Sequence, residues 1–598
     1  MKKAIIASAL SWALLAGCSQ PSQSTQTTNQ APSASSIVAQ PAEQPTLNAT
    51  QYSNQFVDEL WQLYPEFALY VGYYDYDAQL PIADQQRREQ ELQWLKQQQT
   101  SISQLLSSEL TEHQRTDLSL MANFVERAIW QLETFKSWQW DPSEYNVAGG
   151  FAQIINGDYK PEIERLRTVL SRLEHVPAYY QAAQANISNP AIPQTRLAIQ
   201  QNQGVASVLS DELLAKALAS DMTDAEKVEF EARLSAAQIA VASYVDFLTG
   251  LLPEAEGADP VYRLGEAMYE QKFAFDIQSQ LTAKQLYERA LADQKMIHGK
   301  MAELTTELWP KYFADQAMPA EPMQAIAQML ERLSQVHAKP TEFKAAVEQQ
   351  IPELIAFIKA NDLMTLDDDK PLVIRHTPEY MRGYAVASIQ APGPYDAKAN
   401  TYYNVMPLDD MPADQAESFL REYNQYLMQV LNIHEAIPGH YTQLVYANKS
   451  PSLIKSIIRN GAMIEGWAVF AERMMLEAGY GDFEPELWLM YYKWNLRVVT
   501  NTILDYSIQV LGMEQEQAMD LMVNQAFQQQ AEAAGKWRRA TLSQVQLTSY
   551  YAGFSDILVL RDKAKQAWGE DYSIKRFNET FLSYGNAPVP VIAELMLK

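Results

Sequence analysis

The chain has 598 residues, of which 47 are basic and 73 acidic, so its formal net charge is −26. This charge disfavours nucleic acid and anionic membrane surfaces as partners, because both repel an acidic protein. Hydrophobic residues make up 47% of the chain, which is enough for a large buried core. Composition therefore predicts a large globular protein that does not bind nucleic acid.

The first 18 residues have the pattern of a bacterial lipoprotein signal peptide. A basic start is followed by an apolar stretch, residues 4–16, that is short for a membrane span. The stretch ends in Leu15-Ala16-Gly17-Cys18, which resembles a lipobox, and Cys18 is the only cysteine in the chain. We therefore expect lipidation at Cys18; an ordinary signal peptide with an incidental cysteine is the alternative. Ser19, rather than Asp, resembles the sorting signal for the outer membrane, and we expect the protein to face the periplasm.

Residues 19–48 consist mainly of Gln, Ser, Thr, Pro and Ala. Such a composition cannot bury a core, so it predicts a disordered tether. We expect contact with the membrane only through the lipid, since no later segment has the length and apolar content of a span. The oligomeric state remains open.

The body of the chain is predicted to be mainly helical. Thr223–Glu226 forms a capping box, and apolar residues then recur at helical spacing as far as a possible stop at Gly250. A second box, Thr282–Gln285, opens a helix to about Trp309. We expect a helical lobe over residues 49–370 and a second lobe, with short strands, over residues 371–598.

Three short strands are predicted at residues 371–375, 384–390 and 401–406, separated by Pro and Gly turns. In the third, Tyr402 and Asn404 alternate with Tyr403, so they share one face and are candidates for substrate binding. A purely structural hairpin is the alternative.

The next helix, predicted over residues 412–437, ends in the most informative motif of the chain, His434-Glu435-Ala436-Ile437-Pro438-Gly439-His440. It resembles the zinc-hydrolase helix His-Glu-x-x-His with a longer spacing. Six residues rotate a straight helix by about 240°, which would separate the two rings. Pro438 and Gly439 favour a break that could return His440 to the His434 side. A helix that simply ends before a chance histidine is the alternative.

A second helix, residues 461–475, places Glu465 and Glu472 on one face beside an apolar stripe. A buried carboxylate needs a partner, and a metal would supply one. Two histidines and one glutamate leave an open zinc position, which is typical of catalytic sites. A solvated face, or pairing with Arg473, is the alternative. A further helix is predicted at residues 513–535.

With the late block Ser549–Gly553, these motifs resemble the bacterial family called domain of unknown function 885, from about Tyr52 to the C-terminus. That family is similar to gluzincin metallopeptidases. The resemblance implies a two-lobed, helical, zincin-like fold in which a small β-sheet beside the active-site helix offers an edge strand to an extended peptide.

The resemblance also implies one zinc ion per chain. His434, His440 and Glu465 would be its ligands, Glu435 the general base, and Tyr550 the group that steadies the oxyanion. Glu472 would support the ligands from behind.

The chain departs from its relatives at three positions, where Tyr441, Asn501 and Asp505 replace residues common in the family.

We therefore expect a zinc-dependent peptidase that acts on peptides or small proteins. A metallohydrolase of a non-peptide amide or ester, and a binding lipoprotein with a degraded site, are the alternatives. No basic cluster in the sequence indicates a carboxylate anchor; Arg375, Arg382 and Arg497 are isolated candidates.

Overall fold

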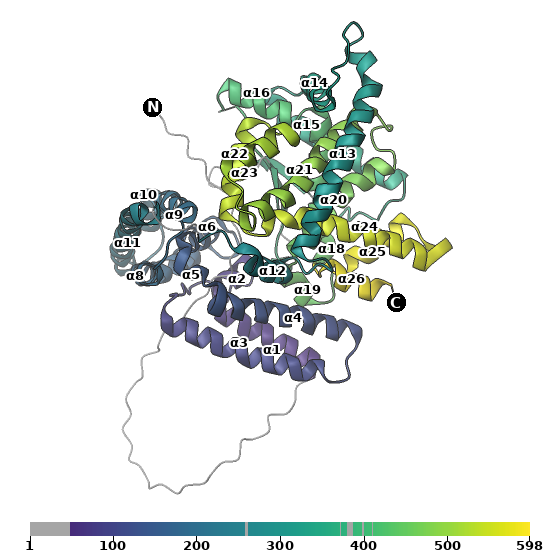
Figure 1. Ribbon diagram of the computed structural model, residues 1–598. Coiled ribbons are helices and arrows are strands. Elements are labelled where there is room, and N and C mark those ends of the chain that lie inside the picture. The colour runs from purple at the N-terminus through teal and green to yellow at the C-terminus, as the bar shows by residue number, and fades with distance from the viewer. Residues whose placement is uncertain are drawn as a thin grey trace, which may run out of the picture. The chain divides into compact units, whose positions relative to one another are not determined.

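The computed structural model describes residues 48–256, 261–370, 372–378, 387–396, 400–409 and 411–597. The predicted signal peptide, Cys18, nearly all of the predicted tether, and Arg382 lie outside these ranges. The described chain is mainly helical with one small sheet, as predicted (Figure 1).

The described residues form two compact units. One, called here the N-terminal unit, comprises residues 48–188 and 201–250; the other, the C-terminal unit, comprises residues 189–200 and 251–597. The lobe boundary predicted at residue 370 lies within the C-terminal unit. The main helices of the N-terminal unit are α1 (Ala49–Leu63), α2 (Pro65–Tyr70), α3 (Gln85–Leu106), α4 (Glu112–Trp130), α5 (Ser137–Trp140), α6 (Ala148–Asn156), α7 (Glu162–Leu173), α8 (Val176–Asn186), α10 (Asp211–Ala219) and α11 (Asp224–Glu256).

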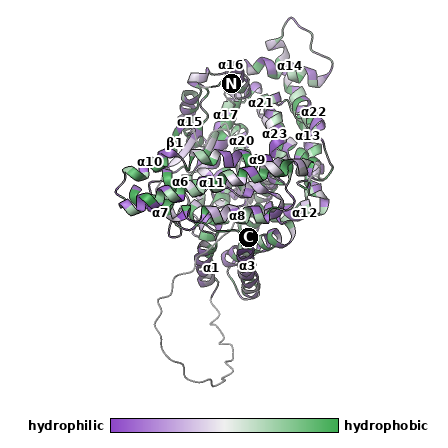
Figure 2. Cartoon of the chain, turned by 90° about the vertical axis from the view of Figure 1, so that its left-hand side faces the viewer, coloured by the Kyte–Doolittle hydropathy of each residue, from purple (hydrophilic) through white to green (hydrophobic). Residues whose placement is uncertain are grey.

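Helix α11 begins one residue after Thr223, as the capping box predicts, but it runs through Gly250 rather than stopping there. By length and composition alone, its segment Asp224–Pro253 would be apolar enough to cross a membrane, the one such helix in the described ranges. One face of the helix, from Phe230 to Leu248, is buried in the unit, whereas Val228 and Ile239 are exposed, so α11 is an amphipathic helix. Figure 2 shows hydrophilic and hydrophobic residues interspersed along the helices.

The C-terminal unit carries the predicted motifs. Its helices are α12 (Gly265–Asp276), α13 (Ala283–Tyr312), α14 (Pro322–Ser334), α15 (Phe343–Ala360), α16 (Ala413–Glu422), α17 (Gln425–Glu435), α18 (His440–Ala447), α19 (Leu453–Ile457), α20 (Gly461–Glu477), α21 (Pro485–Gln509), α22 (Gln515–Asp520), α23 (Gln530–Leu542), α24 (Ser549–Trp568), α25 (Ile574–Ser583) and α26 (Val589–Met596). Helix α9 (Ile192–Gly204) begins in this unit and ends in the other.

Two predicted helices are each interrupted. The helix predicted over residues 412–437 is α16 followed by α17, because the side chain of Asn424 accepts hydrogen bonds from the backbone N–H groups of Tyr426 and Leu427 and so caps a new helix. The helix predicted over residues 513–535 is broken between α22 and α23, where Phe527 adopts a left-handed φ of 54°.

The sheet has the strand order β1 (Leu372–His376), β3 (Thr401–Val405), β2 (Ala387–Gln390). Strand β3 is central: it pairs parallel with β1 and antiparallel with β2. The hydroxyl of Tyr403 donates to Asn432 Oδ1 of α17 at 2.8 Å, which ties the sheet to the helix that carries His434.

Helix α20 lies inside the unit, packed along α24 and against α17 and α18 (Figure 1). Its predicted apolar stripe includes Trp467, Phe470 and Met474, all buried. This packing brings the segment after Gly461 to the end of α17, although the sequence separates them by almost thirty residues.

Candidate metal centre

A tight turn joins α17 to α18 between His434 and His440. The helix ends at Glu435, and the N–H of Gly439 donates to the carbonyl of Ile433 at 2.9 Å. A Cβ atom on Gly439 would lie 1.8 Å from the carbonyl oxygen of His434, so only glycine fits this close approach. The indole N–H of Trp467 donates to the Pro438 carbonyl at 2.9 Å, which holds the turn against α20.

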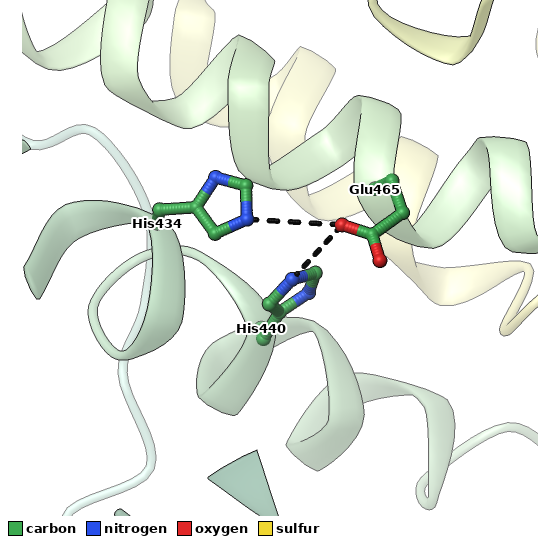
Figure 3. Close-up of side chains that lie close together, drawn as sticks. All are labelled: His434, His440 and Glu465. Carbon is green, nitrogen blue, oxygen red and sulfur yellow. Dashed lines mark ion pairs between the residues drawn. The ribbon is translucent and has the colours of Figure 1, made fainter. Parts of the chain in front are cut away.

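The turn brings both histidines to one carboxylate. Their ring centroids are 4.7 Å apart, and Nε2 of His434 and of His440 lie 3.7 and 3.3 Å from Oε2 of Glu465 (Figure 3). The three residues each offer a donor atom, and these atoms lie within 4.8 Å of one another. The helix break predicted from Pro438 and Gly439 therefore returns His440 to the His434 side.

Glu472 lies behind His434. Its side chain is fully buried, and its Oε1 lies 2.6 Å from Nδ1 of His434 and accepts from the indole N–H of Trp494 at 3.0 Å. This contact directs Nε2 of His434 towards Glu465, an arrangement typical of metal-binding histidines. Arg473 instead pairs with Glu477, so the predicted alternative of an Arg473 pair is wrong.

The site contains more negative than positive charge. Glu435 is half-buried at the end of α17; burial raises its pKa, opposed by His440 and His434. Burial would lower the pKa of His434, but Glu465 and Glu472 raise it well above its ordinary value. Burial would raise the pKa of Glu465, but His440 and His434 lower it. Three carboxylates thus surround two imidazoles.

Tyr550 lies in the first turn of α24, the helix in closest contact with α20. A Cβ on Gly553 would lie 1.6 Å from the Ala462 carbonyl oxygen, so the backbones of the two helices touch next to Glu465. The hydroxyl of Tyr550 accepts a hydrogen bond from Arg539 Nη2 at 3.2 Å.

The three positions expected to differ from the relatives have partners in the structure. The hydroxyl of Tyr441 donates to the backbone carbonyl of Lys370. Asn501 Oδ1 accepts from Lys536 Nζ at 3.1 Å, and Asp505 Oδ2 accepts from the Tyr269 hydroxyl at 3.1 Å.

The structure does not bring Tyr402 and Asn404 to the histidines. Because residues alternate along β3, they lie on the face opposite Tyr403, which contacts α17. Asn404 is buried and accepts from Arg375 Nε at 2.8 Å, and the Arg375 guanidinium stacks 3.8 Å from the Tyr402 ring centroid. β3 is paired on both sides, so among the described strands β1 and β2 are the outer ones, where a peptide could add.

Two contributors were not predicted from the sequence: Trp494, which fixes Glu472, and Arg539, which contacts Tyr550. Neither lies in a recognisable motif, and their partners are distant in sequence. Only the packing of α21 and α23 identifies them.

Comparison with known proteins defines the family. A solved structure of a candidate lipoprotein of unknown function from Shewanella oneidensis is 54% identical over 92% of this chain and 100% of that one, with a TM-score of 0.85. The crystal structure of a candidate lipoprotein from Colwellia psychrerythraea is 16% identical, covers 91% of this chain and 98% of that one, and shares the fold with a TM-score of 0.73. A search of curated proteins finds no match. The family model described as bacterial protein of unknown function (DUF885) matches residues 65–596, and the chain therefore belongs to that family.

Proposed function

We propose that this protein is a zinc-dependent peptidase, similar to gluzincins, that hydrolyses peptide bonds in the periplasm. The observation that carries the proposal is the convergence of His434, His440 and Glu465 beside the carboxylate of Glu435. Two histidines and one carboxylate form the ligand set of catalytic rather than structural zinc sites.

The residues fit a zinc ion. Ligands bound at 2.0–2.2 Å in a tetrahedron lie roughly 3.4 Å from one another, and the Glu465 oxygen lies 3.3 and 3.7 Å from the two Nε2 atoms. That oxygen is buried and makes no hydrogen bond to any described residue. A dication would also balance the excess of carboxylates, whose burial without a counter-charge is costly.

Each residue then has a defined task. When bound, zinc supplies a Lewis acid that lowers the pKa of water towards ~7 and polarises a carbonyl. Glu435 accepts the proton of the attacking water and delivers it to the leaving amine. Its burial-raised pKa makes it a better base than an exposed carboxylate. Because Arg539 donates to the Tyr550 hydroxyl, the phenolic proton remains free to bond the oxyanion.

The location is proposed from the lipobox ending at Cys18 and from the two relatives described as candidate lipoproteins. Lipid at Cys18 would anchor the protein in the outer membrane, and the acidic body would contact peptides rather than the membrane surface.

Metal content and turnover test the proposal. The form beginning after Cys18 should hold about one zinc per chain by elemental mass spectrometry, His434→Ala should lose it, and His113→Ala, on α4 of the other unit, should retain it. Glu435→Gln should keep the metal and lose about 10²- to 10⁴-fold in kcat on a peptide library. Bound zinc without turnover of any peptide would refute the peptidase and favour another hydrolase or a binding protein.

A further inference from the structure

A group of buried and half-buried cations lies on α21 and α23, helices that pack side by side (Figure 1). We call Lys493, Arg497, Lys536 and Arg539 the cationic cluster. Two carboxylates accompany these four cations. Lys493 Nζ pairs with Glu422 at 2.7 Å, and Arg497 pairs with Glu532. Within the described chain, no carboxylate remains within ion-pair distance of the other two cations.

Lys536 and Arg539 have only neutral partners. Lys536 is 6% exposed and donates to Asn501 Oδ1 at 3.1 Å, while the half-buried Arg539 donates to Gln546 Oε1 at 2.7 Å and to the Tyr550 hydroxyl. Nη1 of Arg497 is buried and lies 3.9 Å from Glu422 Oε1, within ion-pair distance but without a hydrogen bond to a described residue. Burial, followed by Arg497, lowers the pKa of Lys536 well below its ordinary value. Buried positive charge in excess is costly unless an anion compensates it.

The cluster adjoins the candidate metal centre. The Trp494 ring, which lies 6.3 Å from the His434 ring between centroids, lies 5.2 Å from the Arg497 guanidinium. On the other side, Arg539 holds Tyr550, the proposed oxyanion donor. Burial lowers the pKa of Arg539, but Tyr550 and then Glu465 raise it, so Glu465 lies within its electrostatic range. Because Arg539 donates to Tyr550, an anion on Arg539 would lie beside the proposed oxyanion donor.

We propose, resting on the peptidase function above, that the cationic cluster binds the free C-terminal carboxylate of the substrate. Arg539 contacts the carboxylate directly, and Arg497 supplies positive charge behind it. The bound anion would oppose the effect of burial on Lys536 and favour its protonated form. A guanidinium matches the planar geometry of a carboxylate and binds it through two hydrogen bonds. A peptide whose terminal carboxylate is held by Arg539 ends at the cluster. The enzyme therefore removes residues near the C-terminus of short peptides.

Three peptides test this inference. Two have the same sequence and end in a free carboxylate or in an amide; the third also ends in an amide but has Asp as its last residue. The wild type should cleave the free acid about 100-fold better in kcat/KM than the amide, since hydrogen bonds to charged groups are the strong ones. Arg539→Gln and Lys536→Met should each bring the ratio of kcat/KM between the free acid and the amide close to one, and Arg539→Gln should in addition lower kcat on both peptides because it loses the hydrogen bond to Tyr550. Lys536 does not contact Tyr550, so Lys536→Met separates the anchor from any effect on the oxyanion donor.

Arg538→Gln is the matched control, because Arg538 is the adjacent residue on α23 and donates to Gln200 at 2.6 Å instead. It should keep the preference. Binding of the three peptides to zinc-loaded Glu435→Gln, measured by calorimetry, gives a readout without turnover. Tighter binding of the free acid than of the amide to this variant would support the anchor even if the wild type hydrolysed no peptide. Absence of hydrolysis would refute only the peptidase function.

Equal cleavage and equal binding of free acid and amide would overturn the anchor while leaving the peptidase intact. If the amidated Asp peptide were cleaved and bound as well as the free acid, the C-terminal anchor would also be overturned. The cluster would then bind acidic side chains instead.

Discussion

Replacing Glu472 tests whether the contact behind His434 prepares the metal site. The fully buried Oε1 atom receives hydrogen bonds from the Trp494 indole and, in the metal-binding tautomer, from Nδ1–H of His434, whereas buried Oε2 has no partner in the described structure. Glu472→Gln can keep both hydrogen bonds through its carbonyl and place its amide where Oε2 lies. It removes the charge and places two amide N–H donors where the partnerless Oε2 lies. Glu472→Ala removes the charge and the acceptor, and leaves two buried donors without a partner.

The expected magnitudes differ accordingly. Loss of a partner behind a metal-binding histidine lowers metal affinity about 10- to 100-fold, and we assign the lower end to Glu472→Gln and the upper end to Glu472→Ala. Each buried donor left unpaired costs about 1–3 kcal/mol. Glu472→Ala leaves the donors of His434 and Trp494 unpaired and Glu472→Gln leaves its own amide unpaired, so both variants should lower the Tm of the metal-free protein.

Zinc affinity is measured by competition with a chromophoric chelator, and Tm by thermal unfolding. Glu477→Gln is the control, since Glu477 lies on the same helix but pairs with Arg473 and Arg561. Its zinc affinity should equal that of the wild type. If Glu472→Ala bound zinc as tightly as this control, Glu472 would not be orienting a metal-binding histidine, and the reasoning would fail.

Three further outcomes are expected. Gly439→Ala should abolish zinc binding and lower the Tm, because its Cβ would lie 1.8 Å from the His434 carbonyl oxygen; unchanged metal content would contradict the observed turn. Tyr550→Phe should lower kcat by about 10²-fold with little change in KM, whereas an effect confined to KM would move Tyr550 from the oxyanion to substrate binding. Protonated His434 has a raised pKa in the fold, so it stabilises the metal-free protein fully below pH ~6.5, and this contribution is lost as the pH rises through the folded pKa. Zinc needs the neutral ring, so the zinc-induced rise in Tm should grow with pH over that range; a rise that shrinks with pH would exclude His434 as a ligand.

Local signals in the sequence predicted the helices where side chains of the same segment determine the outcome. The box at Thr282 begins α13, and the apolar face of α11 is buried as its spacing predicts. The break at Asn424 is also local, but a single asparagine inside a long periodic pattern is a weak signal. Its capping role is visible only in the backbone geometry.

The candidate metal site also combines features that local sequence predicted with features that depend on packing between distant segments. Pro438 and Gly439 marked the turn, because proline lacks the N–H that a continuing helix needs. Strand order could not be predicted, since three short strands are compatible with several pairings, and β3 became the centre of the sheet rather than an edge. Nothing near Trp494 or Arg539 in sequence indicated their partners, because those contacts come from packing between helices.

Charge connects the two halves of the proposed site. Around the two histidines, the three carboxylates of Glu435, Glu465 and Glu472 give an excess of negative charge, which a bound cation would balance. Around Tyr550 the excess is reversed, because Lys536 and Arg539 have only neutral partners. A metal alone would relieve the first imbalance and sharpen the second, since it adds positive charge beside Arg539. A substrate that carries a carboxylate completes both sides at once, so the preference for a free C-terminus should strengthen when zinc is loaded, and binding to the metal-free Glu435→Gln protein should discriminate less.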